Sequence, residues 1–183
     1  MPHYTRAGDD GSTTLWGGGR IPKYHPQPEA YGAVDEASSA LGLGRALAVD
    51  PRTREIAIEL QRRLYLIMAE LAVAPGKPIP DDFSTQPEQI EQLEAWAAEL
   101  ETLAPPPNEF VLPGGSPGSA ALDLARTTIR RAERETIRLR DSGHDVNADT
   151  IRYLNRASSV LFDLARYEEA AAGATTLSAR ESA

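Results

Sequence analysis

Six arginines lie between positions 126 and 140 of a chain that otherwise has more acidic than basic side chains. Arg126, Arg130 and Arg134 are spaced four residues apart, which places them on one side of a helix. Like charges in this arrangement repel one another unless an anion lies over them. A guanidinium group binds two phosphate oxygens at once and stabilises the charge of a departing anion. The row therefore indicates a polyphosphate site, and the alternative is neutralisation by nearby acids such as Asp123.

The segment from Met1 to about Pro28 is rich in Gly, Thr, Ser and Pro and has no sustained period. Its backbone N–H groups and hydroxyls could bind phosphate. The segment matches neither the P-loop pattern nor GxGxxG, and Lys23 lies outside the P-loop spacing, so a purely structural loop is the alternative. Leu15 and Trp16 give the segment apolar side chains that can pack against a body, so we expect an ordered loop rather than a frayed tail.

Five segments beyond Pro28 carry apolar residues at helical spacing and must position these groups. Pro51 predicts the start of the second helix, Thr85 to Glu88 predict a capping box for the third, and the prolines at 105–107 predict its end. Short loops join the helices. The sequence therefore predicts an all-α fold, a five-helix up-and-down bundle forming one domain over residues 1–183. Residues 170–183 lose the apolar stripe, and we expect them to fray.

Composition excludes several classes of protein. The chain of 183 residues has no cysteine, which excludes disulfides, thiolate metal sites and cysteine nucleophiles. Its net charge of −8 opposes binding to nucleic acid or to an anionic membrane. The N-terminus has no apolar run of the signal-peptide type, and no stretch is long enough to span a membrane. We therefore expect a cytoplasmic protein.

Three blocks of sequence resemble the motifs of the PduO-type ATP:cob(I)alamin adenosyltransferases, in that family's order. The first consists of YTRAGDDGST at 4–13, Lys23 and AYGAVDE at 30–36. The second consists of FVLPGG at 110–115, ART at 125–127 and RRAER at 130–134. The third consists of YLNR at 153–156, LF at 161–162 and AR at 165–166. The resemblance extends from about Tyr4 to Tyr167, and three ordered motifs are more specific than any one of them.

The resemblance implies transfer of the 5′-deoxyadenosyl group of ATP to the cobalt of cob(I)alamin, in a homotrimer with its active sites between subunits. It implies that the N-terminal loop, residues 1–28, of one subunit binds ATP through Thr5, Arg6, Ala7, Gly8, Thr13, Thr14 and Lys23. From the helices of the next subunit, the implied ATP ligands are Arg130, Arg131, Glu133, Arg134 and Asn155. Mg²⁺ is expected to enter through the ATP phosphates, without a metal site on the protein.

The resemblance assigns catalytic roles to Asp35, Phe110, Arg126 and Arg130. Asp35 is implied to pair with Arg126 across the subunit boundary, and Phe110 to press against the corrinoid and keep the lower ligand off the cobalt. The alternative for Phe110 is an aromatic anchor that holds a loop in the core. The resemblance also implies two protein partners in vitamin B12 metabolism, a reductase for the corrinoid and an enzyme that uses adenosylcobalamin.

Three positions depart from the family's pattern. Asp123 occupies a position where the family usually has His, Ser159 one where it usually has Asp, and Ala37-Ser38 replace Leu-Asn. A carboxylate is thus lost from the fifth helix and gained on the fourth, which suggests a relocated charge partner for the arginines; altered corrinoid handling or lost activity are the alternatives. Two other functions stay open: a paralogue that uses ATP on another acceptor, and a nucleotide- or corrinoid-binding chaperone or sensor without turnover.

Overall fold

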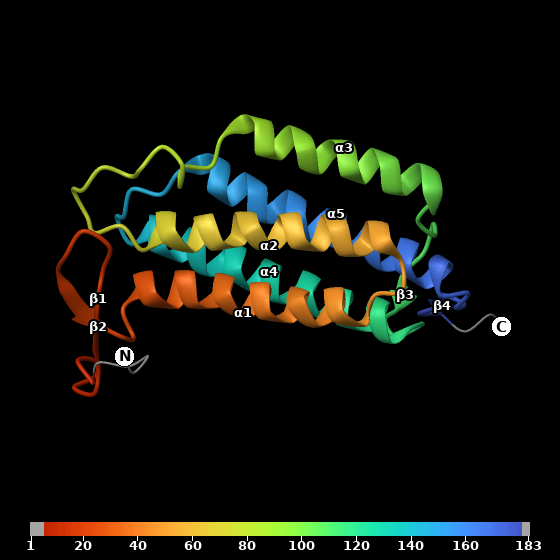
Figure 1. The fold of residues 1–183 in the computed structure, drawn as a ribbon, viewed down its shortest axis with the longest axis horizontal. Coiled ribbons are helices and arrows are strands. Elements are labelled where there is room, and N and C mark those ends of the chain that lie inside the picture. The colour runs from red at the N-terminus through yellow and green to blue at the C-terminus, as the bar shows by residue number, and fades with distance from the viewer. Residues whose placement is uncertain (1–5, 181–183) are drawn as a thin grey trace.

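Five helices run up and down along one long axis of the molecule (Figure 1). The computed structural model describes residues 6–180. The helices are α1 (Pro26–Leu47), α2 (Pro51–Leu71), α3 (Pro87–Leu103), α4 (Pro117–Asp141) and α5 (Ala148–Ala171). The first four begin at a proline, whose fixed φ suits the first turn of a helix and whose missing N–H is not needed there. The predicted all-α fold is confirmed, although α1 begins two residues before Pro28.

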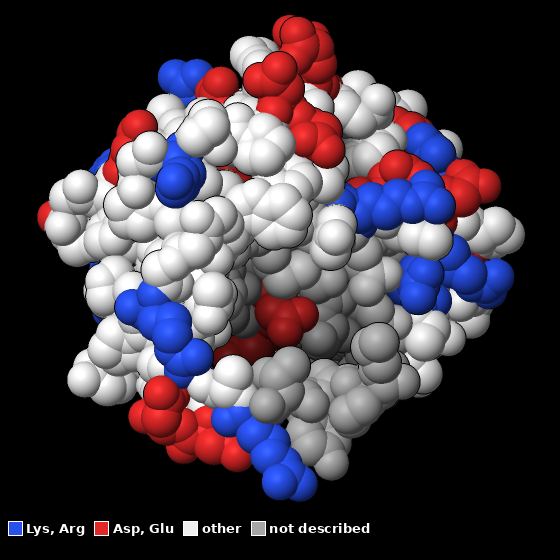
Figure 2. Space-filling view, turned by 60° about the vertical axis from the view of Figure 1, so that its left-hand side comes forward, with Lys and Arg blue, Asp and Glu red and all other residues white. Residues whose placement is uncertain are grey.

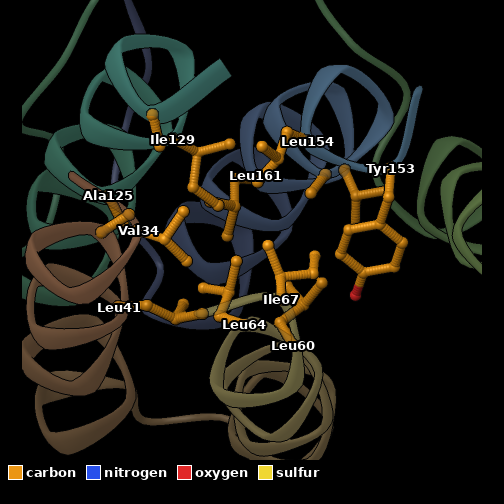
Figure 3. Close-up of a cluster of buried hydrophobic side chains, with 14 of the residues drawn as sticks. Val34, Leu41, Leu60, Leu64, Ile67, Ala125, Ile129, Tyr153, Leu154 and Leu161 are labelled. Carbon is orange, nitrogen blue, oxygen red and sulfur yellow. The ribbon is translucent and has the colours of Figure 1, made fainter. Parts of the chain in front are cut away.

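The core lies between α1, α2, α4 and α5 (Figure 3). Leu41, Leu64, Ile129 and Leu161, one from each of these helices, are completely buried. The α1–α4 contact is the tightest: a Cβ added at Gly44 of α1 would lie 2.9 Å from Cδ2 of the Leu122 side chain on α4. By contrast, α3 lies mainly against α5, and Arg52 of α2 reaches it through an ion pair with Glu99 at 2.7 Å. In residues 6–180, no helix is long and apolar enough to cross a membrane.

The N-terminal segment is ordered through a hairpin. Strand β1 (Ser12–Thr14) pairs with antiparallel β2 (Arg20–Pro22). Trp16 attaches the hairpin to the end of α2: its N–H donates to Ala72 O at 2.9 Å, and its carbonyl accepts from Ala74 N at 2.9 Å. The ring of Trp16 meets that of Phe83 edge to face, with 5.4 Å between centroids. Residues 12–22 of the loop therefore contain two short strands, held by the segment that follows α2.

Residues 172–180, part of the segment expected to fray, contain a short strand. Strand β4 (Leu177–Ser178) pairs with antiparallel β3 (Val111–Leu112) at the end of the bundle opposite the hairpin (Figure 1). Thr176 Oγ1 donates to Glu169 Oε2 at 2.7 Å, and Ala179 N donates to Phe110 O at 2.8 Å. Polar bonds of this kind can join a segment without an apolar stripe to the rest of the fold, and the expected fraying of residues 170–183 stays a prediction.

The predicted capping box of α3 is displaced by one residue. The N-cap of α3 is Gln86, whose N–H donates to the Gln89 side chain at 2.5 Å. Thr85 instead lies 2% exposed, and its hydroxyl donates to Glu70 Oε2 at 2.9 Å. Glu70 also accepts from the Thr150 hydroxyl at 2.9 Å. Thr85 therefore joins α2 to α5 in a buried polar network, and this long-range role takes it away from the local cap.

One buried carboxyl makes the stability of the fold depend on pH. Asp163 on α5 is 8% exposed, and burial raises the pKa of its carboxyl to about 6, with a further contribution from the negative charge of Glu101. A carboxyl with a raised pKa in the folded state stabilises the fold at low pH, and this stability is lost as the pH rises from about 4 through about 6. Replacement of Asp163 by Asn should therefore raise the free energy of unfolding at pH 8 by about 1–2 kcal/mol and change it little at pH 4. Urea unfolding of both proteins at the two pH values checks this, and equal effects at both would contradict it.

Candidate functional site

The arginine row lies on α4 and divides into neutralised and unneutralised members. Arg126 Nε donates to Asp123 at 2.9 Å, Arg131 pairs with Glu36 of α1, and two further arginines have acidic neighbours on α4. Arg130 and Arg134 are exposed, and neither has an ion pair in the described part of the chain. Neighbouring acids therefore neutralise four of the six arginines in the described part of the chain. Arg130 and Arg134, both predicted to bind phosphate, remain without an acidic partner there.

Two of the other predicted ligands on the helices bind each other. Asn155 Nδ2 on α5 donates to Glu133 Oε1 on α4 at 2.9 Å, and both line a shallow hollow between α3, α4 and α5. In residues 6–180, Glu133 forms this bond to α5 and no ion pair with the arginines beside it. Arg134 Nη1 donates to the backbone oxygen of Arg130 at 3.1 Å, which leaves its other terminal nitrogen available to a ligand.

One predicted loop ligand, Lys23, lines a second hollow, and Gly8 lies close to its side chain. Gly8 approaches the end of the Lys23 side chain so closely that an added Cβ would lie 3.2 Å from Lys23 Nζ. Lys23 N donates to Gly11 O at 2.9 Å, and Lys23 and Gly11 line a hollow of about 540 Å³ with Asp10 and Tyr24.

Arginine and serine side chains hold the turn of this loop. Arg20 Nη2 donates to Ala7 O at 2.5 Å and to Asp10 Oδ1 at 2.9 Å. Hydrogen bonds from Ser12, and then the charge of Arg20, lower the pKa of the Asp10 carboxyl. The other predicted ligands of the loop are spread along it: Arg6 has a φ of 59°, Thr13 and Thr14 belong to β1, and Thr5 lies outside the described residues.

Phe110 lies at the other end of the bundle, beside Arg126. Its side chain is 83% exposed, which excludes the alternative that it anchors a loop in the core. Together with Arg126, Phe162 and Arg180 it lines a hollow of about 700 Å³. The hollow combines aromatic faces with guanidinium groups, and such a surface suits a large, partly apolar ligand that carries polar groups at its edge.

One chain does not bring these groups together into one site. In the part of the chain described, no hydrogen bond or ion pair joins residues 8–24 to α4, and the loop, the Glu133–Asn155 pair and Phe110 line separate hollows. With the hairpin end turned forward, Lys and Arg side chains lie at several separate places, with acidic side chains between them (Figure 2). Asp35 is exposed on α1 and lines none of these three hollows.

The departure at Asp123 has a clear structural result. Asp123 is 4% exposed and accepts from Arg126 Nε at 2.9 Å and from Arg166 Nη2 at 2.5 Å. Asp123 is therefore a charge partner of two arginines, and its relocation from the fifth helix stays a prediction. Ser159, at the position from which the carboxylate was lost, is exposed on α5. Sequence reasoning gave no role to Arg166 or Glu169, although charged residues inside the apolar stripe of α5 were a usable signal.

Comparison with known proteins identifies the family of this chain. Residues 3–168 match the model of the cobalamin adenosyltransferase family. The chain belongs to this family. It is 40% identical over 169 residues to the corrinoid adenosyltransferase PduO of Citrobacter freundii, a match that covers 92% of this chain and 50% of that protein. It is 36% identical over 177 residues to the corrinoid adenosyltransferase of Bacillus subtilis, covering 94% of this chain and 89% of that protein.

Solved structures of the same family share the fold. A variant of the PduO-type ATP:corrinoid adenosyltransferase from Lactobacillus reuteri, complexed with cobalamin and ATP, superimposes with a TM-score of 0.87 at 31% identity. That match covers 100% of this chain and 98% of the other. Another variant, complexed with ATP, gives a TM-score of 0.85 at 31% identity. This family member spans about half the length of the PduO proteins from Citrobacter freundii and Salmonella typhimurium.

Proposed function

We propose that this chain transfers the 5′-deoxyadenosyl group of ATP to the cobalt of cob(I)alamin or a related corrinoid and releases triphosphate. The observation that carries the proposal is the pair of exposed arginines, Arg130 and Arg134, that lack an acidic partner in the described residues while their neighbours on α4 are neutralised. Family membership and relatives named as corrinoid adenosyltransferases support it.

The chemistry needs no nucleophile from the protein. The electron pair of cobalt(I) attacks C5′ of ATP and forms the Co–C bond, while the bond from C5′ to the triphosphate oxygen breaks and its electron pair leaves with triphosphate. The protein has to align the two substrates and stabilise the charge that builds up on the leaving group. Arg130 and Arg134 suit the second task because guanidinium groups bind phosphate oxygens in pairs.

Phe110 suits the corrinoid half of the reaction. An exposed aromatic ring beside a large hollow can press against the corrinoid face and exclude the lower axial ligand from cobalt. Loss of that donor makes reduction of cob(II)alamin to cob(I)alamin easier. A chaperone or sensor without turnover would have no use for such a group, so the exposed ring favours the enzyme over that alternative.

We further propose that the ATP site forms between the subunits of a homotrimer. Within one chain the loop and the arginine row line separate surfaces, and a second copy could bring them together. The outer faces of α1 and α4 carry exposed apolar side chains next to these groups: Leu43 is 49%, Leu47 43% and Leu124 51% exposed. Asp35 lies about two turns before Leu43 on α1, and we propose that it pairs with Arg126 of a neighbouring subunit.

Replacement of Asp35 by Asn tests the shared boundary. The change removes the charge that would pair with Arg126 of the neighbouring subunit, so the trimer should dissociate at a higher protein concentration than the wild type. KM for ATP should also rise, by about three- to tenfold for an interaction of about 1 kcal/mol. Sedimentation velocity and steady-state kinetics check both effects. An active monomer, in the wild type or in the variant, would contradict the proposal.

We propose that Mg²⁺ binds to the nucleotide rather than to a metal site on the protein. Residues 6–180 contain no group of three His, Asp or Glu side chains that could hold a metal ion, whereas polyphosphate oxygens bind Mg²⁺ readily. We therefore propose that Mg²⁺ enters bound to ATP, where it adds positive charge beside the arginines. A reductase that supplies cob(I)alamin, an enzyme that uses adenosylcobalamin, and a cytoplasmic location complete the proposal.

Anaerobic incubation with ATP, Mg²⁺ and chemically reduced cobalamin tests the activity itself. The spectrum should change to that of an alkylcobalamin as the Co–C bond forms, and triphosphate should appear in equal amount. Omission of ATP is the control. A protein that binds both substrates with no spectral change would be a binding protein, and the proposed activity would be wrong.

A further inference from the structure

Three buried charged groups connect Arg126 to the segment that carries Phe110. Asp123 is 4% exposed and Arg166 3% exposed, and each has its charge opposed by more than one partner. Asp123 Oδ1 accepts from Arg126 Nε at 2.9 Å, and Oδ2 accepts from Arg166 Nη2 at 2.5 Å. Arg166 Nη1 forms an ion pair with Glu169 Oε2 at 3.1 Å. A charge is expensive to bury without a partner, so each group depends on the others.

Glu169 carries the connection to both sides of the Phe110 segment. Its Oε1 accepts from Gly115 N at 3.1 Å, and its Oε2 accepts from Thr176 Oγ1 at 2.7 Å. Gly115 follows β3, and Thr176 precedes β4, which pairs with β3. The backbone oxygen of Phe110 accepts from Ala179 N at 2.8 Å. The carboxylate of Glu169, which pairs with Arg166, therefore also binds the segments next to β3 and β4, the two strands beside Phe110.

Arg126 is held by one nitrogen only. Its Nε binds Asp123, while neither terminal nitrogen forms a hydrogen bond in the described part of the chain. The side chain is 25% exposed and lines the Phe110 hollow. A carboxylate bound at Nε fixes the plane of a guanidinium group and leaves its two outer nitrogens for a ligand or a neighbouring subunit.

We propose that Asp123 is a positioning residue for the corrinoid half of the site. Its carboxylate orients Arg126 and, through Arg166 and Glu169, couples that orientation to the placement of Phe110. The proposal rests on the proposed adenosyltransferase activity and adds to it a specific set of residues that align the corrinoid. It also explains how the chain accommodates a carboxylate at position 123. Two arginines neutralise its charge, and its bond to one of them, Arg126, orients that side chain.

Asp123→Asn tests the proposal, with Glu168→Gln as the matched control. Glu168 is also a buried carboxylate at this end of the bundle, but it accepts from the backbone N–H groups of Val49 and Asp50 and does not touch Arg126. Both variants should have a lower melting temperature. Only Asp123→Asn should lower kcat/KM for cob(I)alamin, by about tenfold to a hundredfold for a misaligned group. Its KM for ATP should rise no more than that of Asp35→Asn, which removes a proposed partner of the same Arg126.

A double variant separates positioning from a general loss of structure. In the Arg126→Gln background, Asp123→Asn should cause no further loss of kcat/KM for the corrinoid, because its effect passes through Arg126. Multiplied losses, or a kinetic effect of Asp123→Asn no larger than that of Glu168→Gln, would overturn the proposal. If Asp123→Asn does not fold, Thr176→Val, which removes the half-buried end of the connection, should raise KM for the corrinoid alone; unchanged kinetics would overturn it. Wild-type protein without turnover would instead contradict the proposed activity.

Discussion

Arg130→Lys should lower kcat by about tenfold to a thousandfold while the fold and the net charge stay the same. Lysine keeps the positive charge but cannot bind two phosphate oxygens in one plane, so the departing triphosphate loses a preorganised group, and the size of the loss follows from that. Arg130 is the clearest member of the row to change because its side chain has no ion pair to lose in the described part of the chain. Steady-state kinetics with saturating cob(I)alamin measure the effect.

Arg138→Lys is the matched control on the same helix. Arg138 is 72% exposed and pairs with Glu135 at 2.8 Å, an ordinary surface ion pair three residues apart. Such pairs contribute about 0–1 kcal/mol and tolerate Lys, so kcat and KM should stay the same. If the row were only structural, both variants would show small changes in melting temperature and none in rate. A fully active Arg130→Lys protein would remove the main support for the ATP site.

Phe110→Ala should have its largest effect when the reaction starts from cob(II)alamin. We expect a loss of about a hundredfold in that assay, equivalent to about 2.7 kcal/mol of the barrier, because the lower ligand is no longer excluded and cobalt is harder to reduce. With cobalamin already reduced chemically, the loss should be far smaller, and KM for ATP should stay the same. Both assays use the same protein preparation. In the first, a reductase reduces cob(II)alamin during the reaction; in the second, cobalamin is reduced chemically before the enzyme is added.

The exposure of Phe110 makes this comparison clean. A side chain that is 83% exposed contributes little to the core, so Phe110→Ala should leave the melting temperature nearly unchanged. A change in rate then reports on the corrinoid rather than on folding. Equal losses in the two assays would contradict the role of Phe110 in excluding the lower ligand and leave it a general contact with the corrinoid.

The helices could be predicted because their signals are local. The apolar residues of α4, such as Ile129 and Ala132, repeat within each turn, and the prolines at the helix starts act on their own backbone. Thr85 shows the limit of local signals. Its hydroxyl could cap α3, but both its hydroxyl and its backbone N–H donate to the carboxylate of Glu70, fifteen residues away. Strand β4 shows the same limit, since its partner Val111 lies far back in the sequence.

The candidate site divides in the same way. The Asp123–Arg126 pair is three residues apart on one helix and was within reach of sequence reasoning. The Asp123–Arg166 contact joins α4 to α5, and the Glu169–Gly115 contact joins α5 to the loop before α4. Only the fold reveals these two contacts. The division of the arginines into paired and unpaired members also needed the structure, because Arg131 finds its acid, Glu36, on α1.

Mixing two inactive variants tests most directly whether the ATP site lies between subunits. Lys23→Ala removes a loop ligand and Arg130→Ala a helix ligand, and each homotrimer should be inactive. The two chains, co-expressed with different tags and purified through both, should regain about a third of the wild-type activity per site, because every mixed trimer has about one boundary in three that combines an intact loop with an intact helix. An ATP site built within one chain would give no recovery in the mixed protein, and that result would contradict the shared site.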